Sequence, residues 1–261
     1  PNDDFSVIFG TAAAAATIDN DVYESRIDAI VDIRGWASFF AINGATAGWD
    51  HYGFGNAHNS FAYMPRKGGS SIFIYDMDHT LGGGISLFPS AGWPVPYRMF
   101  NQPRFRRVYW SVLREIVDGP YANVDSFFDP WYAAFINNNA STYSTANYKS
   151  WIAGARSTIQ NQLNSVASVF AITTRGGNDF STNSTLITLE GSAPVEVASL
   201  RVNGSPAVVS YPSVTTWRMH FGLPAGTQLL NVAGVDWRGN LVAQDAITVT
   251  QLAAPPSPVD Q

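Results

Sequence analysis

Residues 59–76 read NSFAYMPRKGGSSIFIYD, and this stretch contains two short runs of strand-forming residues with a turn between them. The runs 59–64 and 70–76 are rich in Phe, Tyr, Ile and Ser, and the connection PRKGG carries a proline and two glycines. Such a pattern predicts a β-hairpin. The second run ends at Asp76, and Asp78 follows two residues later. A buried carboxylate without a partner is very costly, so we expect this end of the hairpin to hold a metal ligand or a nucleophile.

The segments around the hairpin predict helices. Apolar residues recur at helical spacing in 20–48, which predicts one helix capped by Asn20 or Asp21 and a second that starts after Asp32. Further helices are expected at 103–117, 123–137 and 145–170, while the glycine- and proline-rich segment 82–102 is expected to be irregular.

The composition changes after the last of these helices. Short alternating runs, separated by turn residues, continue to residue 252 at the roughly 8–12-residue spacing of a β-sandwich. We therefore predict an α+β fold with two domains. The predicted parts are a mainly helical domain at 1–175, a polar linker at 176–185, an all-β sandwich domain at 186–252 and a proline-rich tail at 253–261.

The overall composition limits the classes of function. The chain has 261 residues, a net charge of −5 and 13% charged residues, about half of the usual quarter. The acidic balance argues against nucleic-acid binding, which needs a basic surface. The absence of cysteine excludes disulfides, thiolate catalysis and cysteine-bound metals. No apolar run approaches the roughly 20 residues of a membrane span, and the scarcity of lysine favours a secreted protein.

Two kinds of phosphate chemistry are compatible with the acidic end of the hairpin. In the first, Asp76 is the nucleophile of a HAD-type phosphatase and attacks phosphate from the end of a strand. That mechanism needs a downstream lysine and further acids to hold magnesium, within a domain of alternating strands and helices. After the motif, the chain offers one lysine and only scattered acids: Lys149, Asp118, Asp125 and Asp129. We therefore rank the phosphatase third among the hypotheses.

In the second interpretation, the same end of the hairpin holds a metal for phosphoryl transfer. Asp50 is expected in a loop, Asn59 at the start of the first strand and Asp76 at the end of the second. In kinases, a loop Asp positions or deprotonates the acceptor hydroxyl, while an Asn and a second Asp hold magnesium against the nucleotide phosphates. Magnesium prefers a few carboxylate or amide oxygens together with phosphate and water, which this set supplies.

The stretches NGATAGWDHYGFGNAHNSFAYM (43–64) and SSIFIYDMDHTLGGG (70–84) together resemble the CotH (spore-coat protein H) family of atypical, protein-kinase-like proteins. The family carries a W-D-x-Y motif, then H-N before an aromatic strand, then a strand that ends in W-D-x-D-x-T-x-G. The similarity extends over about residues 20–85. The chain departs from the family at Tyr75, where Trp is usual, and at His51, where Gly is common.

The resemblance implies a role for each matched residue. Asp50 matches the catalytic-loop Asp, and Asn59 and Asp76 match the residues that bind the metal and the nucleotide phosphates. Asp78 matches an acid that is either a second metal ligand or a structural residue. The implied cofactors are Mg²⁺ and ATP. The implied reaction is transfer of the ATP γ-phosphoryl group to a Ser or Thr hydroxyl of an extracellular or envelope protein.

The resemblance also implies a fold and a location. It predicts a kinase-like C-terminal lobe at 1–175 and an immunoglobulin-like sandwich at 186–252, in a bacterial protein that is secreted or displayed on the cell surface.

A kinase site also needs an N-terminal lobe with a phosphate-binding lysine. Asp50 lies too near Pro1 for such a lobe to precede it, and Lys67 lies on the wrong side of the motifs. Because both ends of the sequence look cut, we expect a piece of a longer precursor. Either a separate N-terminal fragment of that precursor completes the site, or the chain is a non-enzymatic surface, structural or adhesive protein.

Overall fold

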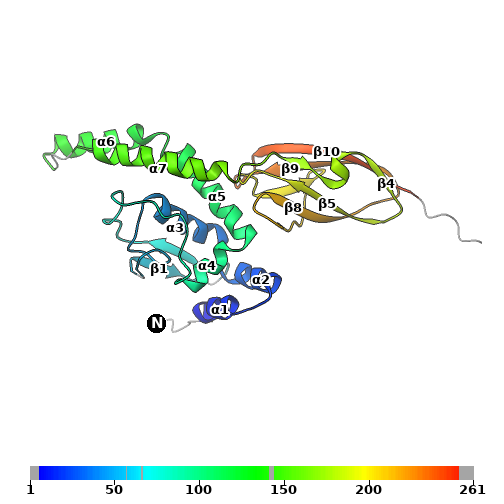
Figure 1. Ribbon diagram of the computed structural model, residues 1–261, viewed down its shortest axis with the longest axis horizontal. Coiled ribbons are helices and arrows are strands. Elements are labelled where there is room, and N and C mark those ends of the chain that lie inside the picture. The colour runs from blue at the N-terminus through cyan, green and yellow to red at the C-terminus, as the bar shows by residue number, and fades with distance from the viewer. Residues whose placement is uncertain (1–5, 57, 66, 141–143, 253–261) are drawn as a thin grey trace, which may run out of the picture. The chain divides into compact units, whose positions relative to one another are not determined.

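The computed structural model describes residues 6–56, 58–65, 67–140 and 144–252. It divides the chain into two compact units, Pro1–Ser165 and Val166–Gln261. The first unit is mostly helical with one small β-hairpin, and the second is built from β-strands, so the chain is an α+β protein as predicted (Figure 1). None of the helices in these ranges is long and apolar enough to cross a membrane.

Side-chain caps mark where two of the predicted helices of the first unit begin. Asp32 accepts a hydrogen bond from the Gly35 N–H (3.0 Å) and caps α3, as predicted. Helix α2 is instead capped by Asp19, one residue before the predicted Asn20 or Asp21, because a cap residue must lie outside the helix in extended backbone. The helices of this unit are α1 (Ser6–Ala15), α2 (Asn20–Ile30), α3 (Ile33–Ala45), α4 (Pro94–Phe100), α5 (Pro103–Asp118), α6 (Val124–Asn137) and α7 (Ala146–Asn164).

Two of the helical predictions need correction. The segment 82–102 is not wholly irregular, because α4 forms inside it and buries Met99 and Phe100. The two prolines of α4, Pro94 and Pro96, lie in its first turn. The backbone N–H groups of the first turn make no intrahelical hydrogen bond, so their absence in proline costs nothing there. Helix α7 ends at Asn164, earlier than the predicted residue 170, because the chain there enters the second unit.

The predicted hairpin forms as β1 (Ser60–Tyr63) paired antiparallel with β2 (Ser71–Ile74). Its turn end is tied to the break between α2 and α3. The Ser70 N–H donates to the Ile30 carbonyl and the Ser70 carbonyl accepts from the Asp32 N–H, each over 2.8 Å. These two bonds fix the hairpin against the helices and leave its other end, where the strands open, free to carry the site.

Aromatic side chains form the core of the first unit. Phe40 is fully buried and meets Phe39 and Phe100 edge-on, with ring centroids 5.2 and 5.3 Å apart. Phe100 also lies edge-on to Phe105 and Tyr109. Each such pair contributes about 0.5–1.5 kcal/mol beyond the burial of its area, so this cluster holds α3, α4 and α5 together beneath the loop that follows α3.

The second unit consists of two sheets that face one core (Figure 1). One sheet has the strand order β4-β10-β9-β6-β7 and the other β3-β5-β8. Alternate residues point inward, so that Leu189 and Trp217 from one sheet pack with Leu200, Leu230 and Val249 from the other. The strands are β3 (Ala171–Ile172), β4 (Phe180–Thr182), β5 (Leu186–Ser192), β6 (Ser199–Val202), β7 (Ser205–Pro206), β8 (Thr216–Gly222), β9 (Gly226–Val235) and β10 (Leu241–Gln251), with the short 3₁₀ turn η1 (Thr174–Gly177) after β3.

The division between the units lies earlier than predicted. The second unit begins at Val166, so the helical domain does not extend over all of 1–175. The predicted linker 176–185 contains β4, which pairs in parallel with β10 and extends the larger sheet. Among the three residues of β4 only Phe180 is apolar, so the sequence of this strand shows no alternation of apolar and polar residues. The predicted tail at 253–261 lies outside the described residues.

Candidate functional site

The open end of the hairpin brings together residues from three separate places in the sequence. Asp50 lies in the loop after α3, and Asn59 directly precedes β1. The Asn59 side-chain amide donates from Nδ2 to Asp50 Oδ2 over 3.1 Å. The Asn59 carbonyl accepts from the Tyr75 N–H over 2.9 Å, and Asp76 follows Tyr75 immediately after β2. The structure thus places Asp50, Asn59 and Asp76 at the same end of the hairpin.

Asn59 and Asp76 both adopt the left-handed backbone conformation, with φ of 51° and 53°. Ala47 (54°) and Leu81 (58°) share it, so four of the seven described non-glycine residues with positive φ lie in 47–81. Asn and Asp tolerate this conformation best, but each such residue still costs on the order of 1–3 kcal/mol. Strain of this kind gathers at functional sites, and here it interrupts the strand alternation at the two predicted ligands.

His51 is fully buried and links the Asp50 loop to the end of β2. Its Nε2 lies 3.2 Å from the Tyr75 carbonyl oxygen. A carbonyl oxygen only accepts, so the hydrogen-bonding pattern assigns the proton to Nε2. His51 is therefore a positioning residue that holds Asp50 beside the backbone from which Asp76 projects. Its role could not be predicted from the motif, in which glycine is common at this position.

The charged and polar oxygens of this cluster have unused bonding capacity. Asp50 Oδ1 is shielded from solvent and has no hydrogen-bond partner in the described part of the chain. A buried acceptor without a donor costs about 1–3 kcal/mol. Because Asn59 uses Nδ2 to bond Asp50, its Oδ1 remains available as an acceptor. Carboxylate and amide oxygens are what Mg²⁺ prefers, and it commonly takes only one or two carboxylates from the protein, so Asn59 and Asp76 fit the ion.

Asp78 is less well placed than the other predicted ligands. Its side chain is 63% exposed and lies 3.6 Å from His79 Nε2, within range of an ion pair if the histidine is protonated. Within residues 6–56, 58–65, 67–140 and 144–252, no group of three or more His, Asp or Glu side chains is arranged to hold a metal. The predicted set Asn59, Asp76 and Asp78 includes an amide and only two acids, so it is not a group of this kind, and Asp78 stays a predicted ligand with a largely exposed side chain.

The loop after Asp76 is held by its own turn and by a distant helix. Thr80 Oγ1 donates to the Met77 carbonyl over 2.8 Å, and the Leu81 N–H donates to the Thr46 carbonyl, also over 2.8 Å. The Trp151 indole N–H, from α7, donates to the Gly83 carbonyl over 3.0 Å. The glycine segment 82–84 is thus held by hydrogen bonds at Leu81, just before it, and at Gly83, within it.

Half-buried aromatic rings pack within and against the Asp50 loop. Tyr52 lies edge-on to Trp93, with ring centroids 5.3 Å apart, and the Trp93 indole N–H donates to the Phe54 carbonyl over 3.1 Å. Burial raises the pKa of Tyr52, so its phenol remains neutral at physiological pH. This phenol contributes packing rather than charge to the site.

The outer face of the hairpin is a feature that the sequence reading missed. Phe61, Tyr63, Phe73 and Tyr75 project from the same face, and each is between 52% and 59% exposed. Phe61 stacks edge-on with Tyr75 (5.3 Å), and Tyr63 lies 6.5 Å from Phe73. The alternation of both strands in fact predicts such a stripe, but aromatic residues are usually assigned to the core. We call this surface the aromatic ladder.

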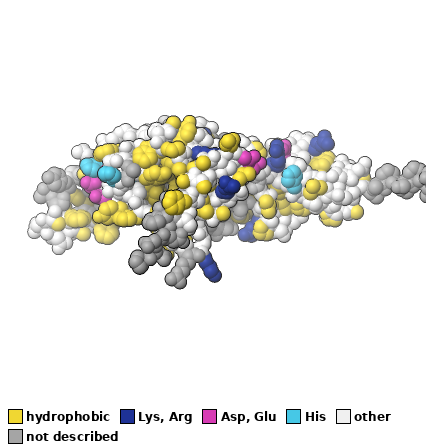
Figure 2. Space-filling view, turned by 90° about the horizontal axis from the view of Figure 1, so that it is seen from below, with side chains coloured by type: hydrophobic (Ala, Val, Ile, Leu, Met, Phe, Trp, Pro, Cys, Tyr) yellow, Lys and Arg dark blue, Asp and Glu magenta, His cyan; other side chains and the backbone are white. Residues whose placement is uncertain are grey.

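A second exposed apolar surface lies on the pair of helices α6 and α7. The two helices form a groove of about 620 Å³, and Phe127, Trp131 and Tyr148 line it while remaining 61%, 66% and 47% exposed. On the face of the molecule seen in Figure 2, hydrophobic side chains cover broad areas and charged side chains are few and scattered. Exposed apolar surfaces of this kind mark interaction sites.

Comparisons with known proteins give little guidance. No family model and no curated protein matches the chain. Among solved structures, one described as "Structures of Clostridium thermocellum CbhA fibronectin(III)-like modules" is similar at 11% sequence identity, over 33% of this chain and 100% of that chain, with a TM-score of 0.25. A likeness at this level assigns neither a fold nor a function.

Proposed function

We propose that the first unit binds a magnesium-bound nucleotide phosphate at the open end of the hairpin and transfers its terminal phosphoryl group to a Ser or Thr hydroxyl. The observation that carries this proposal is the hydrogen bond between Asn59 and Asp50, made beside the left-handed pair Asn59 and Asp76. This bond links Asp50, whose carboxylate can receive a proton, to the end of the hairpin that carries Asn59 and Asp76, the two residues best suited to hold the ion.

Each residue has a distinct role in this proposal. Asn59 fixes Asp50 through Oδ2, and the Asp50 carboxylate accepts the proton of the acceptor hydroxyl. As that proton leaves, the hydroxyl oxygen bonds to the γ-phosphorus, the bond from the γ-phosphorus to its bridging oxygen breaks, and ADP departs. His51 keeps Asp50 beside the end of β2. Asn59 Oδ1 and the Asp76 carboxylate would hold Mg²⁺, which when bound offsets the negative charge of the phosphates.

The wider setting follows the family resemblance. We infer that the first unit corresponds to the C-terminal lobe of a CotH-like kinase and that the second is an immunoglobulin-like sandwich, in a protein that is secreted or displayed on the cell surface. A separate N-terminal fragment would supply the contacts to the nucleotide base. Native mass spectrometry of the isolated material, with and without Mg²⁺ and ATP, would reveal such a fragment and any bound nucleotide.

A transfer assay tests the reaction itself. The chain, together with any N-terminal fragment that native mass spectrometry reveals, would be incubated with Mg²⁺, γ-labelled ATP and dephosphorylated casein as the hydroxyl donor. Removal of a general base lowers transfer by about 10²–10⁴-fold, so we expect Asp50→Asn to abolish detectable transfer. Asp76→Asn, which removes a metal-binding carboxylate, should do the same, and the matched control Asp78→Asn should retain most of the transfer. Transfer that survives Asp50→Asn would refute the assignment. Phosphatase activity that depends on Asp76 but not on Asp50 would favour the HAD-type mechanism.

The setting of β2 is the reason that we do not propose the phosphatase. Asp76 follows a strand of a two-stranded antiparallel hairpin. The phosphatase mechanism instead calls for a strand within alternating strands and helices, which give a parallel sheet.

A non-enzymatic role in surface attachment is the second candidate, and the aromatic ladder is the observation that favours it. Four half-exposed rings on one hairpin face form a contiguous apolar patch of the kind that marks interaction sites. If the chain shows no nucleotide affinity in the presence of Mg²⁺, while Phe61→Ser with Phe73→Ser abolishes its attachment to cells or matrix, the adhesive role takes first place.

A further inference from the structure

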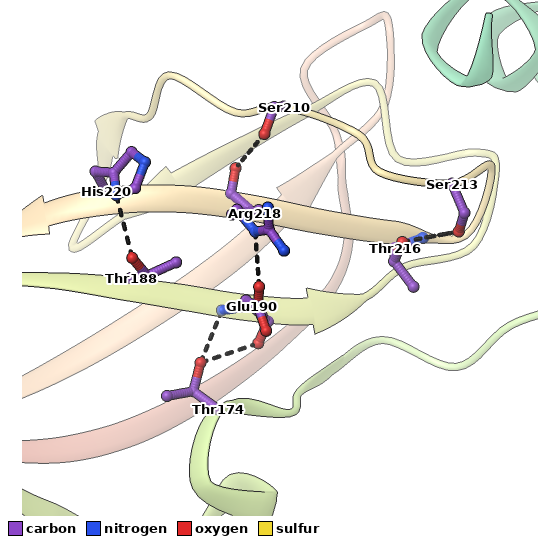
Figure 3. A network of polar contacts seen from close by, with 8 residues as sticks. All are labelled: Thr174, Thr188, Glu190, Ser210, Ser213, Thr216, Arg218 and His220. Carbon is purple, nitrogen blue, oxygen red and sulfur yellow. Dashed lines mark hydrogen bonds and ion pairs between the residues drawn. The ribbon is translucent and has the colours of Figure 1, made fainter.

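The outer face of the smaller sheet in the second unit carries a polar cleft of about 520 Å³. Its floor is the β5–β8 ladder, and the η1 turn forms its side. Figure 3 shows the polar side chains that project there from β5 and β8, with Thr174 of η1 bonded to the backbone of Glu190. The volume lies within the range of small-molecule sites, roughly 300–1,000 Å³.

Two directly opposed pairs of residues make the floor of this cleft (Figure 3). Glu190 faces Arg218 across the ladder, and Arg218 Nε donates to Glu190 Oε1 over 2.6 Å. Thr188 faces His220, with 3.2 Å between Thr188 Oγ1 and His220 Nδ1. Because each pair is in register, the strands themselves fix these four side chains, and no loop movement is needed to assemble them.

Several donors in the cleft have no acceptor within residues 144–252. Arg218 uses only Nε, so both of its terminal nitrogens remain open. His220 uses Nδ1 and leaves Nε2. The Arg175 guanidinium, at the edge of the cleft, lies 5.9 Å from the Phe180 ring and makes no side-chain hydrogen bond in this range. The cleft thus holds two planar guanidinium groups. Each of them can bind a carboxylate through paired N–H groups.

The local charge has the opposite sign to that of the whole chain. The chain carries a net charge of −5, but the charged residues that line the cleft are Arg175, Arg218 and Glu190, two positive and one negative. The pair between Arg218 and Glu190 is 49% and 46% exposed, and an exposed pair contributes only about 0–1 kcal/mol to stability. A ligand anion can therefore share Arg218 with Glu190 at little energetic cost.

We propose that this cleft binds a hydroxylated carboxylate, of the class of uronic acids and the acidic saccharides built from them. The two arginines bind the carboxylate. The Thr173 hydroxyl and His220 Nε2 provide the donors and acceptors that sugar hydroxyls require. This binding role belongs to the second unit alone and does not depend on the phosphoryl-transfer proposal.

Titration of the 261-residue chain with D-glucuronate tests the proposal, with glucose and inorganic phosphate as comparison ligands. A charged hydrogen bond contributes enough to change affinity by about tenfold or more. We expect saturable binding of glucuronate, no binding of glucose, weaker binding of phosphate, and at least a tenfold loss with Arg218→Gln or Arg175→Gln. Arg201→Gln, on the outer face of β6, is the matched control and should change nothing.

A variant that is expected to bind glucuronate more tightly separates an effect on binding from an effect on folding. Glu190→Gln keeps the shape of the side chain but stops it from competing for Arg218, so affinity for glucuronate should rise severalfold. A destabilised sheet would not bind more tightly. The proposal fails if glucose binds as well as glucuronate, if phosphate binds more tightly than glucuronate, if Glu190→Gln weakens binding, or if glucuronate does not bind at all to a chain that circular dichroism shows to be folded.

Discussion

The two polar sites of this molecule are built in different ways. At the open end of the β1–β2 hairpin, side chains are placed by loops, left-handed residues and a buried histidine, and a carboxylate oxygen of Asp50 has no partner among the residues that the structure describes. In the cleft on β5 and β8, side chains project from regular strands, and Glu190 already has its partner in Arg218. Strain and unmet bonding at the first site indicate reaction chemistry, whereas the second is a preformed binding surface.

Removing the core beneath the strand-built cleft gives the largest expected effect. Trp217 is 1% exposed and directly precedes Arg218, one of the two cleft residues of β8. We expect Trp217→Ala to lower the free energy of unfolding of the second unit by about 3–5 kcal/mol, measured by urea denaturation. Trp237→Ala, at a side chain that is 41% exposed, is the control and should cost much less. Equal losses in the two variants would show that Trp217 does not anchor this sheet.

We expect nucleotide binding at the open end of the β1–β2 hairpin to depend on how the turn end of the hairpin is anchored to the helices. A Cβ at Gly69 would collide with the backbone of Val31 and Asp32, whereas a Cβ at Gly68 meets nothing within 4 Å. We expect Gly69→Ala to cost about 1–3 kcal/mol or more and to weaken nucleotide binding. Gly68→Ala, strained only by its φ of +91°, should cost about 1 kcal/mol. Calorimetric unfolding compares the two, and a larger loss for Gly68→Ala would contradict the anchoring.

A charge placed at Asn59 probes the bond that defines the first site. Asn59→Asp keeps the left-handed backbone but sets a second carboxylate about 3 Å from Asp50. We expect a loss of about 1–3 kcal/mol at neutral pH, partly recovered in acid as the pair takes up a proton. Asn59→Gly keeps the backbone conformation and removes the bond without adding repulsion, so its loss should be smaller and independent of pH. Stability measured against pH separates the two variants.

The smallest expected effect concerns the turn between β9 and β10. The Asn240 side-chain amide, with the backbone N–H groups of Asn240 and Arg238, lowers the pKa of Asp236. A lowered folded-state pKa gives stability that is present above the unfolded value of about 3.9 and is lost as the pH falls through the folded value. Asp236→Asn should therefore show a shallower loss of stability between about pH 4 and pH 2 than the unchanged chain. Identical acid profiles would contradict this role.

Local patterns were enough to predict much of this architecture. The cap at Asp32, the proline at the start of α5 and the alternation in β1 and β2 each act within a few residues, so the sequence displays them directly. The domain division was misplaced because β4 is held by its pairing with β10, some 70 residues away. A three-residue edge strand gains its stability from that partner and carries almost no signal of its own.

The candidate site was predictable in its residues but not in its geometry. The spacing of Asp50, Asn59 and Asp76 pointed to a common location, because a hairpin brings the start of one strand beside the end of the next. The clamp made by His51 could not be foreseen, since it depends on the carbonyl of Tyr75, just after β2. Asp78 was predicted from the resemblance alone, and an acid two residues beyond Asp76 points to the same side only while the strand continues. The left-handed conformation of Asp76 ends that alternation.

Metal binding at the open end of the hairpin tests the central claim most directly. Mn²⁺, in place of Mg²⁺, broadens the nuclear magnetic resonance signals of nearby groups, so it would be titrated into the isotopically labelled 261-residue chain with ATP present. The account predicts that the Asn59 side-chain amide and the Asp76 backbone broaden first, that ATP strengthens the effect, and that Asp76→Asn removes it. Broadening confined to other acids, such as Asp125 and Asp129 beside Lys149, or no broadening at Asn59 and Asp76, would contradict it.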